Sequence, residues 1–206
     1  MKERWCILIV LLLSFTACNS DKARNEDGQS PYAYKVSQGN PHFDLPDIQQ
    51  NGELIVLTLY GPESYFEFRG EDFGLQFMIA RQYAKSIGAS IRVDVSRDMK
   101  DLVTKLQNGE GDFVAFQIDK VDSLSSLLDY VGEKELFTFM DSLSRQRKDD
   151  SLRPRPRAAW AVRKDSPLLS ASLSQWMTTH QKEFFDYTTI RVKSGRGRTY
   201  TPRRNV

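Results

Sequence analysis

Apolar positions recur with different spacings along the chain, and each spacing predicts an element. The run Glu53–Tyr60 is apolar and β-branched and has turn residues on both sides, which predicts a buried strand. Over residues 73–87 apolar side chains recur every three or four positions, which predicts an amphipathic helix ended by Gly88. Residues 90–95 alternate apolar and polar side chains and predict a second strand.

The pattern then repeats once more. Residues 98–107 carry a helical stripe with Asp98 in the N-cap position, and residues 112–117 form an apolar run typical of a strand buried on both faces. Short strands that alternate with helices of about ten to fifteen residues favour a parallel sheet with right-handed crossovers. We therefore predict the α/β class, with helices packed on both faces of a parallel sheet.

The rest of the pattern completes this domain. Residues 123–147 show helical spacing, interrupted by a glycine. Residues 153–157 are expected to be extended, because each proline disfavours a helix for the residue before it. A fourth strand follows at Ala158–Val162, and a last helix begins at Pro167 with Ser166 as its expected N-cap.

The first twenty residues indicate export. Lys2 and Arg4 precede the apolar run Trp5–Leu13, which is too short to span a bilayer, since a span needs about 20 apolar residues. Ala17 followed by Cys18 resembles the lipobox of bacterial lipoproteins, whose cysteine becomes the acylated first residue of the mature protein. The alternative is a plain signal peptide or a membrane anchor with an incidental cysteine.

The predicted organisation has four parts. These are a lipoprotein signal peptide (1–17), a flexible polar tether (18–51), a single α/β domain (52–190) and a basic disordered tail (191–206). A second interpretation of the tail is contact with anionic lipid or a cell-wall polymer.

Composition narrows the chemistry. The net charge of +2 does not indicate a nucleic-acid partner. Cys6 and Cys18 are the only cysteines and lie in the signal region, and His42 and His180 are the only histidines. Because these residues do not have the spacing of metal ligands, we expect no metal centre, and we expect no cofactor either. We also expect no catalytic residue, because no residues in the sequence stand out as a serine–histidine triad or as the carboxylate pair of a glycosidase.

Three blocks carry a family resemblance. The first combines Gly52–Val56, the Gly61-Pro62 turn and Phe73–Ala84 followed by Ile87-Gly88, and the others are Gln107–Ala115 and Ala159–Leu169. Their order resembles that of extracellular solute-binding proteins of family 3, with the type II periplasmic binding fold. The binding module of membrane-bound lytic murein transglycosylases is the best match. The resemblance implies a three-layer α/β lobe. The second lobe is missing or replaced by short helices, because residues 118–157 are too few to form one.

The resemblance also implies a site at the carboxyl ends of the parallel strands. The candidate ligand-binding residues there are Tyr60, Ser64, Tyr65, Phe66, Arg69 and Gln117. Aromatic rings beside an arginine can stack on a sugar or an amide and bind a carboxylate. Alternatively, the rings simply cover the sheet edge. The arginine that clamps the ligand carboxylate in amino-acid binders has no counterpart in residues 117–123.

These observations predict a non-catalytic, lipid-anchored, solute-binding-like protein of the bacterial cell envelope, facing the periplasm or the cell exterior. Its expected partners are a small solute, a peptidoglycan fragment or an envelope protein, with the membrane contacted through the lipid anchor. The alternative is a truncated or degenerate relative of the lytic transglycosylases that acts in cell-wall metabolism.

Overall fold

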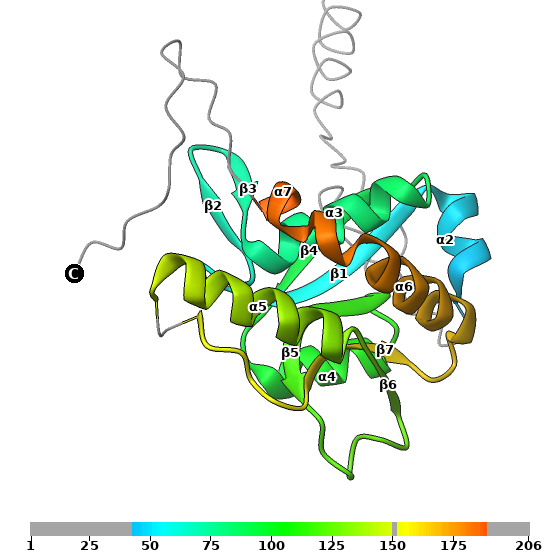
Figure 1. Ribbon diagram of the computed structural model, residues 1–206. Coiled ribbons are helices and arrows are strands. Elements are labelled where there is room, and N and C mark those ends of the chain that lie inside the picture. The colour runs from blue at the N-terminus through cyan, green and yellow to red at the C-terminus, as the bar shows by residue number, and fades with distance from the viewer. Residues whose placement is uncertain (1–42, 150–151, 189–206) are drawn as a thin grey trace, which may run out of the picture. The chain divides into compact units, whose positions relative to one another are not determined.

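A five-stranded sheet forms the centre of the computed structural model, which describes residues 43–149 and 152–188 (Figure 1). The strand order is β4-β1-β5-β7-β6. The strands are β1 (Glu53–Leu59), β4 (Ser90–Ser96), β5 (Phe113–Asp119), β6 (Leu128–Val131) and β7 (Ala158–Arg163). β1 pairs in parallel with both β4 and β5, whereas β7 runs antiparallel to β5 and β6. The predicted α/β class with a parallel core is confirmed.

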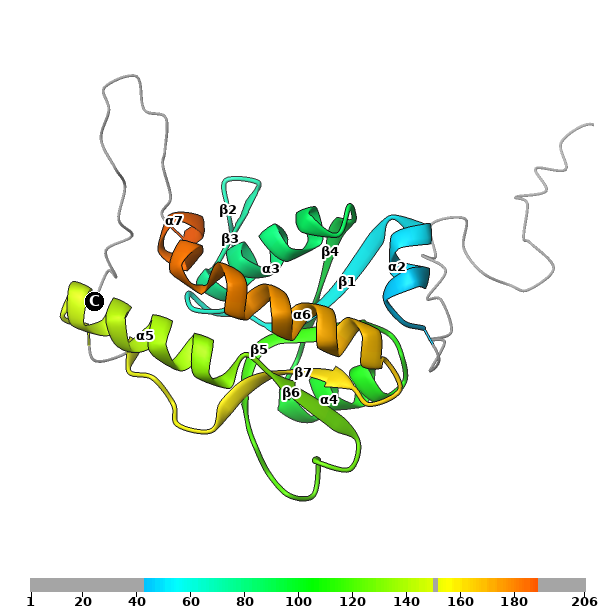
Figure 2. The same ribbon diagram turned by 45° about the vertical axis from the view of Figure 1, so that its right-hand side comes forward.

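Helices cover both faces of this sheet, and the two coverings are unequal (Figures 1 and 2). One face packs against α2 (Leu45–Asn51), α3 (Leu75–Ser86), α5 (Glu133–Arg147), α6 (Pro167–His180) and α7 (Phe184–Thr188). The other face packs against α4 (Met99–Gln107). Trp160 of β7 lies at the centre of the larger core, fully buried against the ring of Phe113 at 5.4 Å between centroids. The result is a three-layer lobe.

The prediction of a helix beginning at residue 123 is wrong for its first half. Residues 123–127 form turns, and β6 pairs with β7 along Leu128–Val131. Pairing with β7 gives β6 a full set of backbone hydrogen bonds beside a buried strand, and this tertiary gain outweighs the local helical spacing. The second half is confirmed, because α5 buries Leu136, Phe139 and Met140.

The described residues begin at 43, and part of the range 18–51 that we predicted to be a flexible tether is helical. α2 lies inside that range, and its Ile48 is fully buried in the main core. Phe43 and Leu45 also pack against this core, although the segment is too short to show a regular apolar period. The signal peptide, Cys18 and the basic segment from 191 lie outside the described residues, as do residues 18–42.

One carboxylate joins this first segment to the last long helix. Asp44 Oδ1 accepts hydrogen bonds from the backbone N–H groups of Leu45 and Leu169, both at 2.8 Å, and Oδ2 accepts one from Leu168 at 3.0 Å. Ser166 holds the N-cap position of α6, but its hydroxyl donates to the Phe43 carbonyl instead. The sequence therefore predicts the position of the cap correctly and the capping side chain incorrectly.

Two buried charged side chains, Asp112 and Arg163, lie near this junction, at the amino ends of β1 and β5. Asp112 Oδ2 accepts a hydrogen bond from Ile55 N–H at 2.7 Å. The Arg163 guanidinium, also buried, donates to the carbonyls of Leu106 and Phe43. Burial raises the pKa of Asp112 to about 6, although the Ile55 hydrogen bond and the Arg163 charge oppose the rise.

A short hairpin that the sequence pattern did not predict follows β1. β2 (Phe66–Phe68) and β3 (Glu71–Phe73) pair in antiparallel register through the two-residue turn Arg69-Gly70, in which both residues have positive φ. Positive φ at both central residues is typical of the type I′ turns that join hairpin strands. Because β3 includes Phe73, α3 begins at Leu75, two residues later than predicted.

Among the described residues, none of the helices has the length and apolar character needed to cross a membrane.

The Asp44 junction predicts a measurable loss of stability. Asp44→Ala removes three accepted hydrogen bonds at two helix starts, so we expect the free energy of unfolding to fall by about 2–3 kcal/mol. Urea unfolding of the full chain measures this change. Asp44→Asn keeps one acceptor oxygen and should lose clearly less, whereas equal losses for the two variants would contradict a capping role.

Asp112 predicts a pH dependence of opposite sign to that of most carboxylates. Its folded pKa of about 6 exceeds the ordinary 3.8, so its stabilising contribution is complete below about pH 4 and disappears as the pH rises through 6. The amount is up to about 3 kcal/mol. Asp112→Asn should flatten the stability curve between pH 4 and 6.5. Asp122→Asn, at an exposed position, should leave the curve unchanged.

Candidate functional site

The carboxyl ends of β1, β4 and β5 lie at one edge of the sheet, because these three strands run in parallel. The segments after β1 and β5 line this edge, which we call the rim. Five of the six predicted ligand-binding residues follow β1, and Gln117 lies in β5.

The turn after β1 is rigid. The Tyr60 and Gly61 backbone pairs with Tyr65, and Ser64 Oγ donates a hydrogen bond of 2.6 Å to the Leu59 carbonyl. The Glu63 and Ser64 carbonyls accept hydrogen bonds from the second and third N–H groups of α3. These two amide groups of α3 are therefore already bonded within the fold.

Gly74 allows the turn to approach the helix so closely. Its φ is +132°, and a Cβ atom placed there would lie 2.8 Å from Tyr65 Cα and closer still to the Ser64 carbonyl. Only glycine fits both the backbone angle and the space. The buried Ser64 thus serves the geometry of the turn, and its hydroxyl is already bonded.

Two tyrosines occupy the ends of this turn. The Tyr60 side chain is 69% exposed, so its ring is available to a ligand. Tyr65 packs edge-on against Phe77 at 5.4 Å between centroids, and its hydroxyl donates to Asp72 Oδ1 at 2.6 Å. Partial burial and the Asp72 carboxylate raise the pKa of Tyr65 to about 12, so Tyr65 acts at neutral pH as a hydrogen-bond donor.

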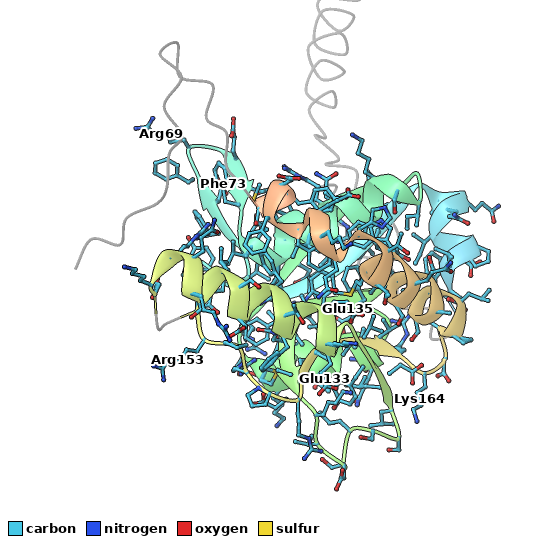
Figure 3. The ribbon with its side chains drawn as sticks, in the orientation of Figure 1. Arg69, Phe73, Glu133, Glu135, Arg153 and Lys164 are labelled. Carbon is cyan, nitrogen blue, oxygen red and sulfur yellow. The ribbon has the colours of Figure 1, made fainter. Side chains whose placement is uncertain are left out.

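The hairpin carries two of the predicted residues away from the rim. Phe66 stacks on Phe73 at 5.7 Å between ring centroids. Arg69 lies at the outer tip of the hairpin, over the ring of Phe68, whereas Phe73 lies nearer the sheet (Figure 3). The structure therefore does not bring Arg69 together with Tyr60 and Gln117.

Gln117 lies within β5 rather than after it, and 4% of its surface is exposed. Its Nε2 has no hydrogen-bond partner among the residues that the structure describes. An unsatisfied buried amide is costly, so a polar ligand atom or a water molecule would be stabilised beside it.

An arginine that sequence reasoning missed lies at the end of β5. The Arg155 guanidinium donates to the Gln117 carbonyl, lies over the ring of Phe116, and has Nη1 3.7 Å from Asp119 Oδ2. It remains close to half exposed. Arg155 comes from the extended segment before β7, and antiparallel pairing of β7 with β5 brings that segment to the rim. The predicted extension of residues 153–157 was the available signal.

Lys120 adds a second cation at the end of β5. It forms an ion pair with Glu133 and lies over the Tyr130 ring, 5.6 Å from its centroid. No group of three or more possible metal-ligating side chains exists within 43–149 and 152–188. The described side chains of the rim are aromatic, amide and cationic, with the Asp119 and Glu133 carboxylates beside the two cations.

No protein-family model matches the chain. Solved structures do match its fold. Domain 1 of the arginine-binding protein TmArgBP, in its arginine-bound form, matches with a TM-score of 0.51 and 14% identity, over 65% of this chain and 97% of that chain. The L-cystine solute receptor of Neisseria gonorrhoeae, unliganded and open, matches with a TM-score of 0.54 and 13% identity, over 71% and 93%.

A third neighbour is the amino-acid ABC transporter substrate-binding protein AbpA of Streptococcus pneumoniae, bound to L-arginine. It has a TM-score of 0.51 and 13% identity, over 69% of this chain and 95% of that chain. Identities this low show the fold alone. The fold is that of a single lobe of the periplasmic binding protein type, and these neighbours are amino-acid solute-binding proteins.

The close approach at Gly74 predicts a strong and local effect. Gly74→Ala should destabilise the protein by about 3 kcal/mol or more, because the backbone of the turn must move. Gly70→Ala is the matched control: its φ is also positive, but no atom lies within 4 Å of the added methyl group. We expect it to cost only about 1 kcal/mol. Thermal or urea unfolding compares the two, and similar losses would contradict this description of the turn.

Proposed function

We propose that this chain is a non-catalytic, solute-binding-like protein of the bacterial cell envelope that recognises a small carboxylate- or amide-bearing molecule at its rim. The observation that carries the proposal is that Tyr60 follows β1 while Gln117 and Arg155 lie in and beside β5, at the carboxyl edge of a lobe that matches 97% of domain 1 of an arginine-binding protein. Amino acids and peptidoglycan fragments both belong to this chemical class.

The rim offers three complementary contacts. The exposed Tyr60 ring provides a flat surface for an apolar or sugar face, and Arg155 provides N–H groups suited to a carboxylate. The Gln117 amide provides a donor from a buried position. Asp119 shares Arg155, so a ligand carboxylate would have to compete with a partly exposed pair that contributes little.

One lobe covers one side of a ligand, and well-formed sites bury about 70–90% of the ligand surface. We therefore expect weak binding, with a Kd in the range of about 10 μM to 1 mM. A partner that supplies the opposing surface would tighten it.

The envelope location rests on the first eighteen residues, where a charged start, a short apolar run and Cys18 favour export and lipidation. The neighbours named above support a solute-binding role rather than an enzymatic one. In the cell-wall interpretation, the same rim would bind a peptidoglycan fragment without cleaving it, and we expect no turnover of purified murein.

A thermal shift assay on the full chain tests the proposal with a panel of amino acids and muropeptides at about 0.01–10 mM, a range that spans the expected Kd. At least one ligand should raise Tm in a saturable way. Isothermal titration then measures the affinity of variants for that ligand. Arg155→Ala and Tyr60→Ala should each bind it at least about tenfold more weakly, because each removes one charged or stacking contact.

Arg147→Ala is the matched control, because Arg147 is exposed at the end of α5. It should bind like the unaltered protein. Absence of any shift across the panel, or equal losses in Arg147→Ala and Arg155→Ala, would count against a solute site at the rim.

A further inference from the structure

β4 forms one end of the five-stranded sheet, and among the described residues no strand pairs with its outer edge. On its inner side it pairs in parallel with β1. The two helices that pack against it, α3 and α4, belong to opposite faces of the sheet. The strand is seven residues long and contains neither proline nor glycine. A long, regular edge of this kind offers its backbone groups to another strand.

The hydrogen bonds to β1 show which backbone groups of β4 face outward. Ser90 N–H donates to the Gly52 carbonyl, on the side of β1, at 2.8 Å. Successive residues of a strand direct their backbone groups to alternate sides, so the even-numbered residues of β4 bond to β1. The N–H and C=O groups that point away from the sheet therefore belong to Ile91, Val93 and Val95.

The side chains of β4 differ between its two faces. Ile91 packs against the larger core, and the alternation of a strand places Val93 and Val95 on the same face. The opposite face carries Arg92 and Asp94, which are both partly exposed. One face of the edge is thus apolar, and the other carries one charge of each sign, on either side of position 93.

A second copy of β4 complements both faces when it runs antiparallel along the edge, with Val93 at the two-fold axis. Arg92 of each copy then lies opposite Asp94 of the other, and Ile91 lies opposite Val95. Opposite charges and β-branched pairs are both stabilising when they face each other across two strands. The outward N–H and C=O groups of residues 91, 93 and 95 take the hydrogen-bonded positions of this ladder.

The charges also select this register. Sliding one copy by two residues would bring Arg92 opposite Arg92 in one direction and Asp94 opposite Asp94 in the other, and both like-charge pairs are unfavourable. In the central register the charges form a row of alternating sign. Glu53 already pairs with Arg92 at 3.1 Å, and Lys105 pairs with Asp94 at 2.7 Å. The charge pattern of the edge therefore fits a second copy of the same strand.

We propose that two copies of this chain associate through β4, in an antiparallel and two-fold symmetric pair that joins their sheets into one. The association does not depend on solute binding. The two rims lie at opposite ends of the joined sheet, because the paired strands are antiparallel. A single strand pair forms a small interface, so we expect a transient dimer with a Kd of about 10–500 μM.

Sedimentation of the full chain between about 20 μM and 1 mM measures this association. The average mass should rise toward that of a dimer. Val93→Pro should weaken the dimer at least about tenfold, because it removes an outward N–H at the axis and no hydrogen bond to β1. A chain that stays monomeric over this range, or a Val93→Pro variant that is folded and still dimerises fully, would overturn the proposal.

Charge reversal tests the register independently of the proline variant. Arg92→Asp and Asp94→Arg should each weaken the dimer at least about tenfold, because each creates two symmetric like-charge pairs. Arg92→Asp/Asp94→Arg restores opposite charges across the axis and should recover the affinity to within about threefold. Arg145→Asp is the matched control, since it breaks an exposed ion pair on α5, and it should change nothing. No recovery in the double variant would contradict the proposed pairing.

Amide hydrogen exchange, followed by NMR, identifies the surface that associates. Between about 50 μM and 1 mM, exchange at Val93 and Val95 should slow roughly twofold or more as the monomer fraction falls. Exchange at Arg92 and Asp94 should stay constant, because their N–H groups are bonded to β1 in the monomer. Slowing confined to other segments would assign the association to another surface and overturn the proposal.

Discussion

The whole lobe depends on the insertion of β7 between β5 and β6. All six residues of β7 are buried, and its Trp160 contacts Phe113 on one neighbour and donates a hydrogen bond to Gln76 on α3. Without this strand the three parallel strands would end in a bare edge. The helices after residue 132 would then lose the surface on which they pack. β7, which comes late in the chain, thus completes the core that β1, β4, β5 and α3 begin to form.

The rim owes its chemistry to the same insertion. The α3 N–H groups that bond to the turn after β1 are not available to a ligand anion. The cationic group at the rim comes instead from Arg155, which β7 brings alongside β5. Arg155 lies in the segment just before β7, so its place at the rim follows from backbone pairing rather than from local sequence.

The sequence predicted the elements whose apolar period is set by burial, including β1, β4, β5, β7 and most of the helices. It failed where tertiary contacts outweigh a local pattern. β6 is stabilised by its backbone pairing with β7, and α2 is held by Ile48 in the core and by the Asp44 hydrogen bonds. In the candidate site, Tyr60 was predictable from its position after a strand. The place of Arg155 at the rim, and that of Arg69 at the hairpin tip away from it, depend on strand pairing. Local patterns in the sequence do not reveal that pairing.

The Asp44 junction also orients the molecule. Residue 43 enters at the amino edge of the sheet, where Asp44 and Arg163 fix it to the start of α6, whereas the rim lies at the carboxyl edge. Any pull on the chain ahead of residue 43 is borne by these partly buried hydrogen bonds at the amino edge of the sheet. The rim and the point where residue 43 enters the lobe therefore lie at opposite edges of the sheet.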